Sequence, residues 1–427
     1  MGEGVLTTGF NRSAGGLACE GVSLETIAGA VDTPTYVYSA SVVREQYERL
    51  ARAFAPVPHR IHYSVKANGN LAVLRLLRSM GAGVDIVSGG ELHRARLAGF
   101  SGAEVVFSGV GKTAAELRDA LEAGVLLVNV ESYGELDLLN RIAGEMGVVV
   151  PVALRVNPEV RVETPHHYTR TGERGLKFGI PYDEALDTAR RAIAMPHVQL
   201  LGLDMHIGSQ VSNSEPYEAG IERLLALVEQ VRAAGGNALR YLDIGGGFAV
   251  TYDTERPLDI EMFGAVVCRA VAGTGLTLIL EPGRFIVGNA GVLLTRVLYR
   301  KRSGEREYII TDAAMNDLLR PSHYQAYHRI VAAEPRGGRV VADIVGPVCE
   351  SGDFFALERD VDDVQPGDLL VIHSAGAYGF AMASNYNSRP RAAEVLVDGD
   401  RFALVTARER YEDLVRQERT EPQWRTD

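Results

Sequence analysis

Lys66 is the residue of this sequence whose position most favours chemistry. It follows the short apolar, alternating run Arg60–Val65 and is followed by the small and polar residues Ala67 and Asn68. This pattern predicts a buried strand that delivers one amine to its carboxyl end. Lysine is strongly hydrated, so two interpretations are open. The amine reaches solvent, or it lies in a pocket where it can form a Schiff base with an aldehyde cofactor.

A run of three glycines offers a second chemical feature. Gly245, Gly246 and Gly247 follow the apolar run Tyr241–Ile244. Because glycine has no Cβ, successive backbone N–H groups can close around a phosphate without obstruction. A tight turn is the simpler interpretation, and both stay open at this point.

A carboxylate and a guanidinium follow the next apolar run. Glu281 comes first, then Pro282, Gly283 and Arg284. The proline makes the turn rigid, and the guanidinium suits bidentate capture of an oxyanion. An ion pair that only closes the fold is the alternative interpretation.

A histidine ends another apolar run upstream. His206 could stack on an aromatic cofactor, and Ser209 could donate a hydrogen bond to a phosphate, although a structural histidine is commoner. No His-x-x-x-His or carboxylate spacing accompanies His206, so the sequence predicts no metal site.

The C-terminal third holds further reactive groups. Cys349 and Glu350 lie side by side in a stretch with glycine and proline, which predicts a turn that carries a thiol and a carboxylate. An inert cysteine beside a surface glutamate is the commoner case. Arg320, Tyr324 and Tyr378 are further candidates, and each is weak evidence alone.

A repeated unit positions most of these residues. Short apolar runs that end in polar or glycine residues alternate with amphipathic helical patterns. The predicted strands are Arg60–Lys66, Gly83–Ser88, Val105–Ser108, Leu126–Glu131, Val152–Asn157, Leu201–His206, Tyr241–Gly245 and Leu276–Glu281. The predicted helices include Leu71–Met80, Glu91–Ala98, Ala114–Ala123 and Tyr217–Ala234. Eight such units over about 220 residues predict a (β/α)8 barrel of the TIM type, whose function gathers at the carboxyl ends of the strands. A doubly wound sheet is the alternative, but the chain has no G-x-G-x-x-G fingerprint.

A mainly β domain follows the barrel. Its predicted strands are Val292–Tyr299, Glu307–Thr311, Arg339–Ile344, Asp368–Ile372, Ala392–Asp398 and Phe402–Thr406. A strand at Thr35–Tyr38 is expected to join the same domain. The predicted divisions are therefore an N-terminal segment 1–38, a barrel 39–290 and a β domain 291–427.

Composition excludes several classes of protein. The chain has 427 residues and a net charge of −11, which argues against nucleic acid or an anionic membrane surface as a partner. Three cysteines far apart exclude a disulfide framework and suit a reducing cytoplasm. We expect neither a secretion signal nor a membrane-spanning run.

The motifs as a set resemble the fold type III pyridoxal-phosphate decarboxylases, and among them the diaminopimelate decarboxylase family. The matching segments span about Pro34 to Glu394, nearly the whole chain. They are Tyr63–Asn68, Val87–Leu92, Phe107–Thr113, Arg155–Pro158, His206–Gln210, Gly245–Gly247, Glu281–Arg284, Asp312–Asp317, Arg320–Pro321, Cys349–Asp353 and Asn385–Pro390. The resemblance implies an alanine-racemase-like barrel with a C-terminal β domain.

The resemblance also implies roles in the barrel. Lys66 would hold pyridoxal 5'-phosphate as an internal aldimine, and Glu281 would pair with the pyridine nitrogen. His206 would stack on the ring. The phosphate contacts would come from Ser209, Gly245, Gly246, Gly247, Gly283, Arg284 and Tyr378.

The resemblance places the substrate contacts at Arg284, Arg320, Tyr324, Glu350 and Tyr378. Cys349 would be the proton donor, and together with Glu350 it would reach into the site of a partner subunit, so a homodimer with shared active sites is expected. The implied reaction is decarboxylation of meso-2,6-diaminopimelate to L-lysine and CO2, the last step of lysine biosynthesis.

Other activities remain as alternatives. The nearest is a sister decarboxylase that acts on lysine, ornithine or a specialised amino acid. A racemase resembles the chain less, because such racemases place an arginine where Glu281 stands. A homologue without catalysis is disfavoured, since Lys66, Glu281 and Cys349 are all present. Residues 162–172, the expected lid loop, depart from the order of the family's motif.

Overall fold

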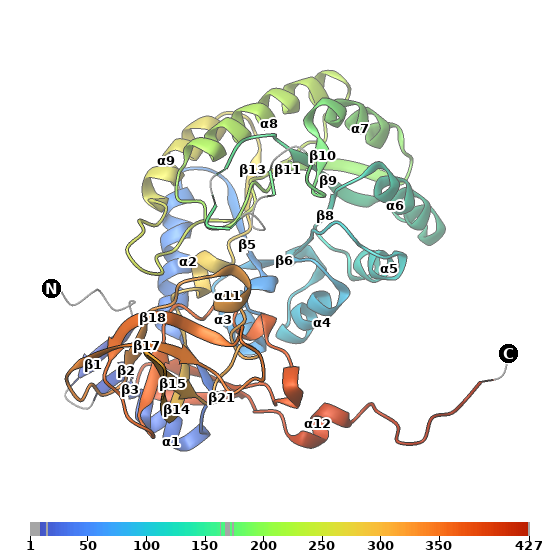
Figure 1. Ribbon diagram of the computed structural model, residues 1–427. Coiled ribbons are helices and arrows are strands. Elements are labelled where there is room, and N and C mark those ends of the chain that lie inside the picture. Colours follow the sequence, from blue (N-terminus) through green and yellow to red (C-terminus); the bar gives the residue numbers. More distant parts are fainter. Residues whose placement is uncertain (1–8, 14–15, 163, 167–170, 173–174, 426–427) are drawn as a thin grey trace. The chain divides into compact units, whose positions relative to one another are not determined.

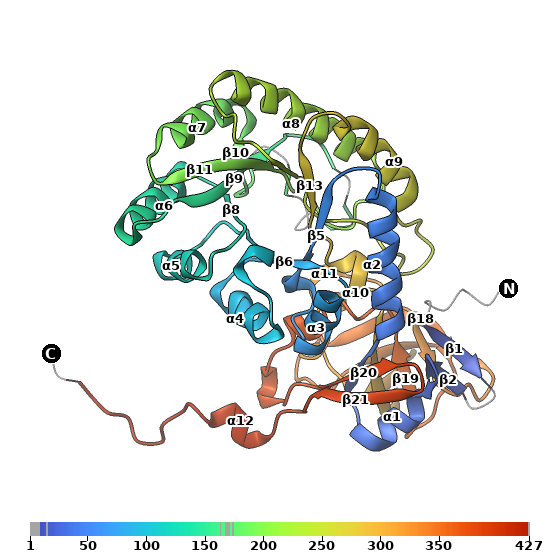
Figure 2. The ribbon, with the colours of Figure 1, turned by 180° about the vertical axis from the view of Figure 1, so that it is seen from behind.

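The chain divides into two compact units. A computed structural model describes residues 9–13, 16–162, 164–166, 171–172 and 175–425. The barrel unit is Ala40–Ala290, and the sheet unit joins Met1–Ser39 to Gly291–Asp427. Figure 1 and Figure 2 show the two units from opposite sides. The predicted lid loop, 162–172, lies partly outside the described residues. Residues 1–8, which belong to the segment where no secretion signal is expected, lie wholly outside them.

The barrel unit contains eight parallel strands, counted over the described residues, that close on themselves. In barrel order they are β5 (His59–Ser64), β6 (Gly83–Ile86), β7 (Val105–Phe107), β8 (Leu127–Val130), β9 (Val150–Asn157), β11 (Val198–Asp204), β12 (Tyr241–Asp243) and β13 (Thr277–Leu280). Pairing of β8 with β9 and of β13 with β5 completes the ring. A two-residue strand, β10 (Ile180–Pro181), adds to β9. The predicted barrel is confirmed.

Helices alternate with the strands and form the outer layer in Figure 1. They are α2 (Ala40–Phe54), α3 (Leu71–Ser79), α4 (Gly89–Ala98), α5 (Ala114–Ala123), α6 (Tyr133–Met146), α7 (Tyr182–Ala194), α8 (Glu215–Ala233) and α9 (Ile260–Val271). A short helix, α10 (Arg284–Val287), follows β13, and all four of its residues are buried. Local sequence explains their starts. Thr113 and Glu116 form a capping box that begins α5, and Gly124 ends this helix in the left-handed conformation. Within the described part of the chain, we find no helix with the length and apolar character needed to span a bilayer.

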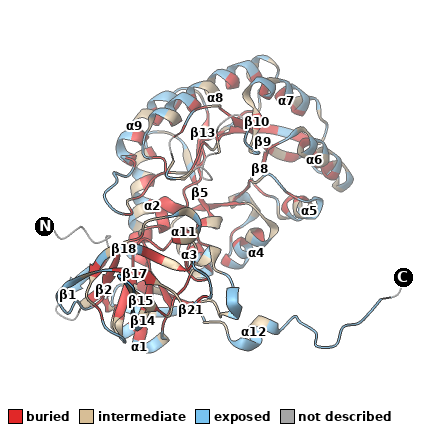
Figure 3. Cartoon of the chain, viewed as in Figure 1, coloured by how far each residue is buried: buried red, intermediate tan, exposed pale blue. Residues whose placement is uncertain are grey.

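The interior of the barrel is layered. Val106, Leu127, Ala153 and Ile279 belong to one apolar cluster contributed by different strands. Strand side chains alternate between faces, so the residue two positions later points the same way. Those next residues are Ser108, Asn129, Arg155 and Glu281, and all are buried. An apolar floor therefore supports a polar layer at the carboxyl ends of the strands, and Figure 3 shows these strands as largely buried.

The sheet unit is a seven-strand path with two additional strands, among the residues described. The path is β18 (Phe354–Asp362), β17 (Arg339–Val345), β15 (Arg306–Thr311), β14 (Gly291–Ser303), β4 (Thr35–Ser39), β20 (Ala393–Asp398) and β21 (Arg401–Thr406). The additional strands are β19 (Leu369–Ile372), which pairs with β14, and β16 (Ile330–Ala332), which pairs with β19. The N-terminal strand β4 lies between β14 and β20, so the predicted association of that strand with the β domain is confirmed.

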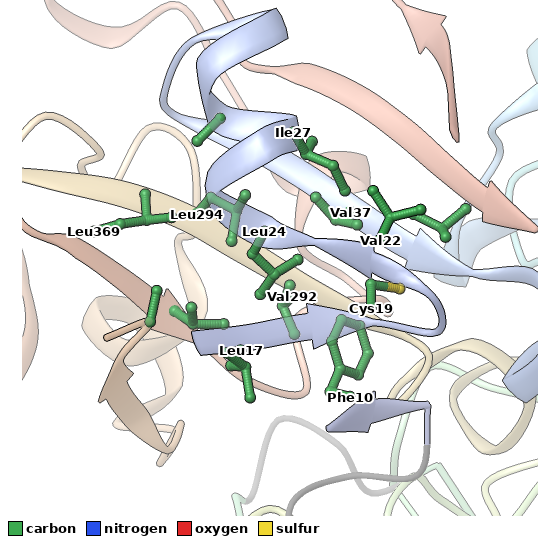
Figure 4. Close-up of a cluster of buried hydrophobic side chains, with 14 of the residues drawn as sticks. Phe10, Leu17, Cys19, Val22, Leu24, Ile27, Val37, Val292, Leu294 and Leu369 are labelled. Carbon is green, nitrogen blue, oxygen red and sulfur yellow. The ribbon is translucent and has the colours of Figure 1, made fainter. Parts of the chain in front are cut away.

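A hydrophobic cluster holds the N-terminal segment in the sheet unit. A small sheet of β1 (Phe10–Ser13), β2 (Gly16–Cys19) and β3 (Val22–Ser23) precedes α1 (Leu24–Val31). Figure 4 shows side chains from these elements packed against residues of β4, β14 and β19, and every labelled residue is buried. The sequence did not predict β1, β2, β3, β16 or β18. Two short helices, α11 (Arg320–Tyr324) and α12 (Tyr411–Val415), complete this unit.

Lys112 makes a buried ion pair that links strand ends in the barrel unit. Its Nζ donates to the carbonyls of Gly109 at 2.8 Å and Asn129 at 2.7 Å, and to Glu135 Oε1 at 2.6 Å. The Lys112 side chain is fully buried and that of Glu135 is 9% exposed.

We therefore expect Lys112→Met to destabilise the protein by about 3 kcal/mol, because it leaves a buried carboxylate unpaired. Lys301→Met, at an exposed position of β14, is the control and should change the free energy of unfolding by less than about 0.5 kcal/mol. Urea denaturation measures both changes. Equal stability of the two variants would show that this ion pair is not needed.

Candidate active site

Lys66 is held by a carboxylate of the neighbouring strand. Strand β5 ends at Ser64, and Lys66 lies in a 3-10 turn, Val65–Ala67, just beyond it. Its Nζ donates to Asp85 Oδ2 at 2.8 Å, and Ser64 Oγ donates to the same oxygen at 2.6 Å. The Lys66 side chain is 34% exposed while that of Asp85 is fully buried. The amine is therefore fixed at the rim of the barrel and still accessible, as a reactive amine must be.

Asp85 was not among the predicted site residues. It lies inside β6, two residues after Gly83 on the same face of the strand, and its Oδ1 is buried without a hydrogen-bond partner among the described residues. A carboxylate within an otherwise apolar run was the signal that could have found it.

Three carboxyl groups gather in the polar layer of the barrel. Asp204, Asp243 and Glu281 are buried, and one oxygen of each lies within 4.8 Å of the others. Asn129 Nδ2 donates to Asp243 Oδ2 and Glu281 Oε1, both at 3.4 Å. Glu281 and Asp243 also share a side-chain hydrogen bond. Such a bond between two carboxyl groups requires a proton on one of them.

The pKa values of the three carboxyl groups agree with a proton held within this layer. Burial, followed by the charge of Asp85, raises the pKa of Glu281 to about 7, although the nearby Lys66 cation opposes the rise. Burial and the charge of Glu281 raise the pKa of Asp204 and of Asp243 well above the usual range. The three groups therefore do not all ionise near neutral pH, and a cationic ligand group beside Glu281 would change which of them holds the proton.

One arginine supplies a buried positive charge to this layer. Arg155 Nη1 donates to Glu131 Oε1 at 2.7 Å, and its Nε lies 4.0 Å from Asp204 Oδ2. Glu131 also accepts from the backbone N–H of Gly179 at 3.0 Å. These contacts fix the guanidinium, which compensates part of the buried negative charge.

The glycine run adopts a backbone that only glycine fits. Gly247 has a φ of +92°. A Cβ on Gly246 would lie 2.0 Å from the carbonyl oxygen of Glu281, and one on Gly247 would lie 2.1 Å from that of Gly208. The predicted loop is therefore a close approach of backbone segments, with Gly245 N–H fixed by Asp243 Oδ1 at 2.9 Å.

Side chains from neighbouring loops meet beside that run. Arg284 Nη2 donates to Ser209 Oγ at 3.1 Å, and Arg284 Nη1 donates to Tyr252 Oη at 2.6 Å. Ser209 follows β11 and Arg284 follows β13, while the glycines follow β12. The predicted residues Ser209, Gly283 and Arg284 are thus brought to one edge of the barrel, with hydroxyl and guanidinium donors suited to a phosphate.

His206 contacts the glycine run. It follows β11 by two residues, and its Nδ1 accepts from the N–H of Gly246 at 3.3 Å. Burial, with the charges of Arg155 and Lys66, lowers the pKa of His206 well below its usual value, although the residue as a whole is partly exposed. The ring is therefore neutral near pH 7 and presents an uncharged face to a ligand.

These residues fit an aldehyde cofactor that carries a phosphate and a basic ring nitrogen. The amine comes from Lys66, the anion donors surround a glycine cradle that a Cβ would fill, and a carboxyl group, Glu281, lies in the buried layer. Asp204 Oδ1 is buried with no hydrogen-bond partner among the described residues, as expected of a layer that a ligand completes.

The remaining predicted residues belong to the sheet unit. Arg320 begins α11, and its Nη1 contacts His328 Nε2 at 2.9 Å in a buried position. Tyr324 ends the same helix and contacts the ring of His323. Tyr378 has a φ of +56° and is partly exposed.

Cys349 and Glu350 lie in the predicted turn. The cysteine is exposed, and its backbone N–H donates to Asn387 Oδ1 at 2.9 Å. Glu350 accepts a side-chain hydrogen bond from Tyr386. Tyr386 and Asn387 lie in the motif Asn385–Pro390, and neither was among the predicted site residues.

Comparison with known proteins gives consistent results. Residues 40–288 match the family described as "Pyridoxal-dependent decarboxylase, pyridoxal binding domain". The chain is 50% identical to a diaminopimelate decarboxylase of Pseudomonas aeruginosa over 408 residues, which cover 95% of this chain and 98% of that protein.

Two solved structures extend the likeness to the whole fold. A diaminopimelate decarboxylase of Helicobacter pylori complexed with L-lysine has a TM-score of 0.89 at 38% identity and covers 92% of this chain and 98% of its own. One from M. jannaschii in co-complex with L-lysine has a TM-score of 0.92 at 33% identity, covering 98% and 99%.

The raised pKa of Glu281 predicts how stability depends on pH in the protein without ligand. The folded state holds a proton on Glu281 up to about pH 7, whereas the unfolded state releases it near the usual pKa of 4.5. The folded state therefore binds more protons in this window, and its stability falls as pH rises through it, by on the order of 3 kcal/mol.

Glu281→Gln should remove this contribution, because an amide does not titrate. We expect the difference in free energy of unfolding between the variant and the original protein to increase from about pH 5 to about pH 8 in the variant's favour. Denaturation at several pH values measures it. A difference independent of pH would contradict the assigned proton.

Proposed function

The chain belongs to the pyridoxal-dependent decarboxylases, and we propose how its residues convert meso-2,6-diaminopimelate to L-lysine and CO2. Within that family it is a diaminopimelate decarboxylase that depends on pyridoxal phosphate. Such enzymes catalyse the last step of lysine biosynthesis. One geometric observation carries the proposal. Lys66, the glycine run and Glu281 follow β5, β12 and β13, which are neighbours in one barrel.

In the barrel unit, each role follows from the chemistry of a side chain. Lys66 would hold the aldehyde of the cofactor. Glu281, as a carboxylate, would pair with the protonated ring nitrogen. His206 would contact the ring. When bound, the cofactor supplies an electron sink for the carbanion left by departing CO2. The phosphate donors are Ser209, Gly245, Gly246, Gly247, Gly283 and Arg284.

The carboxyl layer supports the role of Glu281. A protonated ring nitrogen brings a positive charge next to Glu281, which favours the ionised carboxylate. The hydrogen bond from Asp243 then requires the proton to stay on Asp243. Glu281 would therefore stay ionised and would stabilise a protonated ring nitrogen beside it.

Residues of the sheet unit receive their roles from the resemblance alone. We assign substrate contacts to Arg320, Tyr324, Glu350 and Tyr378, with Arg284 from the barrel unit, and assign proton donation to Cys349. A thiol can deliver a proton near neutral pH. We also propose a homodimer in which Cys349 and Glu350 complete the partner's site. A cytoplasmic location stays a prediction from the sequence.

The substrate has a charged group at each end, and the proposed contacts have complementary charges. Arginine binds a carboxylate by paired hydrogen bonds, and Glu350 can bind the distal ammonium. Lysine and ornithine lack the distal carboxylate, so either would leave a guanidinium of the site unpaired.

We expect the purified, cofactor-loaded protein to release CO2 from meso-diaminopimelate with a kcat/KM at least about 100-fold above those for L-lysine and L-ornithine. Parallel assays of CO2 release with the three amino acids measure the ratio. Equal or faster turnover of lysine or ornithine would favour the sister-decarboxylase alternative instead.

We expect Cys349→Ala to lower kcat by roughly 100-fold, the usual contribution of a positioned acid. The visible absorbance of the bound cofactor should stay as it was, since no proposed cofactor contact is lost. Stopped-assay kinetics with absorbance spectra test both. An unchanged kcat would remove Cys349 from the proton-donor role.

A further inference from the structure

The main chain of Cys349 is fixed by a side chain from a distant segment. Its backbone N–H donates to Asn387 Oδ1 at 2.9 Å, across 38 positions of sequence. Cys349 itself is exposed. This contact therefore fixes the backbone position from which the Cys349 thiol extends.

The base of the turn has a separate anchor. Asp353 is buried, and its carboxylate accepts from the N–H groups of Met315 and Val348, each at 2.7 Å. The N–H of Asp353 in turn donates to the carbonyl of Glu350 at 3.1 Å. These bonds hold the two ends of the turn, and the contact with Asn387 is the one that acts on Cys349 itself.

Asn387 adopts an unfavourable backbone conformation to make this contact. Its φ is +55° and its ψ is +27°, and Ser388 after it also has a φ of +55°. Two successive non-glycine residues in the left-handed region are uncommon, and asparagine tolerates that region best. Both residues are exposed, so packing of their own side chains in a core does not impose it.

Hydrogen bonds of the flanking residues impose the conformation instead. Asn385 Nδ2 donates to Glu409 Oε2 at 2.6 Å on one side of the pair. Arg389 donates to Asn316 Oδ1 at 3.2 Å and to the carbonyl of Asp312 at 2.5 Å on the other. Strained backbone persists where surroundings determine it in this way, and such positions gather at functional sites.

A second contact joins the same two segments. The Tyr386 hydroxyl is hydrogen-bonded to Glu350, and this bond, with the charges of Glu350 and Cys349, raises the pKa of Tyr386. Adjacent residues 386 and 387 thus contact adjacent residues 350 and 349. The segment that carries Tyr386 and Asn387 is therefore aligned with the Cys349–Glu350 turn through two contacts.

We propose that Asn387 is a positioning residue, held in a strained conformation by its flanking contacts so that its side chain fixes the direction of the Cys349 thiol for proton transfer. The proposal rests on the proposed function, in which Cys349 is the proton donor. Catalysis by a proton donor depends on its placement to within a fraction of an ångström, so a loosened turn should slow the chemical step more than it weakens substrate binding.

The test compares three variants of the full-length, cofactor-loaded enzyme. Asn387→Gly relieves the strain and removes the hydrogen bond. Asn387→Asp retains an acceptor oxygen and tolerates the same conformation. Ser388→Gly relieves the strain at the next residue and leaves Asn387 in place, so it is the matched control. For each variant, kcat and KM for diaminopimelate are measured.

The second readout is independent of turnover. The rate of alkylation of Cys349 by iodoacetamide is measured by mass spectrometry of its peptide, since the other two cysteines are buried. We expect Asn387→Gly to lower kcat roughly 10-fold with KM changed less than about 3-fold, and to change the alkylation rate at least about 3-fold. Asn387→Asp should restore kcat to within about 3-fold of the original value, and Ser388→Gly should match the original protein in both readouts.

Three results would overturn the proposal. These are equal behaviour of Asn387→Gly and Ser388→Gly, an effect on KM alone, or failure of Asn387→Asp to restore kcat. A failure of the proposed function itself is distinguishable. If Cys349→Ala turns over normally while Asn387→Gly still alters the alkylation rate, Asn387 positions the thiol but the thiol is not the proton donor.

Discussion

Burial of several carboxyl groups beside one amine is the constraint on which the rest of this structure depends. Asp204, Asp243 and Glu281 lie at the carboxyl ends of the barrel strands, above an apolar floor and near the Lys66–Asp85 pair. Ionising all of them would be costly, so protons, Arg155 and hydrogen-bond donors must compensate. A cofactor with a protonated ring nitrogen provides further compensation. The same burial that destabilises the protein without ligand therefore favours binding of the ligand.

Much of the barrel could be predicted from sequence, because parallel strands buried on both faces are nearly continuous apolar runs. The predicted site residues Lys66, His206 and Glu281 end those runs, and the strands themselves end one or two residues before them. Ser209 and Arg284 lie in the segments that follow. Fold class and family were predicted correctly, and the roles of single residues remain proposals.

The missed features have physical reasons. Asp85 and Asp243 lie inside predicted strands, and which face they point to depends on register, which a single sequence does not determine. Strand β18 is at the edge of its sheet and pairs with β17 alone in its path, so charged residues interrupt its alternation. The Asn387 contact joins two segments that are far apart in the sequence. It also depends on a left-handed backbone, which the residue types Asn and Ser do not by themselves predict.

The most direct measurement locates the cofactor on the chain. The sequence contains only four lysines, at positions 66, 112, 177 and 301, and Lys112 is already committed to a buried ion pair. Borohydride reduction of the pyridoxal-phosphate-loaded protein, followed by proteolysis and mass spectrometry, should find the pyridoxyl group on the peptide that contains Lys66. A label on another lysine, or no label despite visible absorbance of the bound cofactor, would contradict the account.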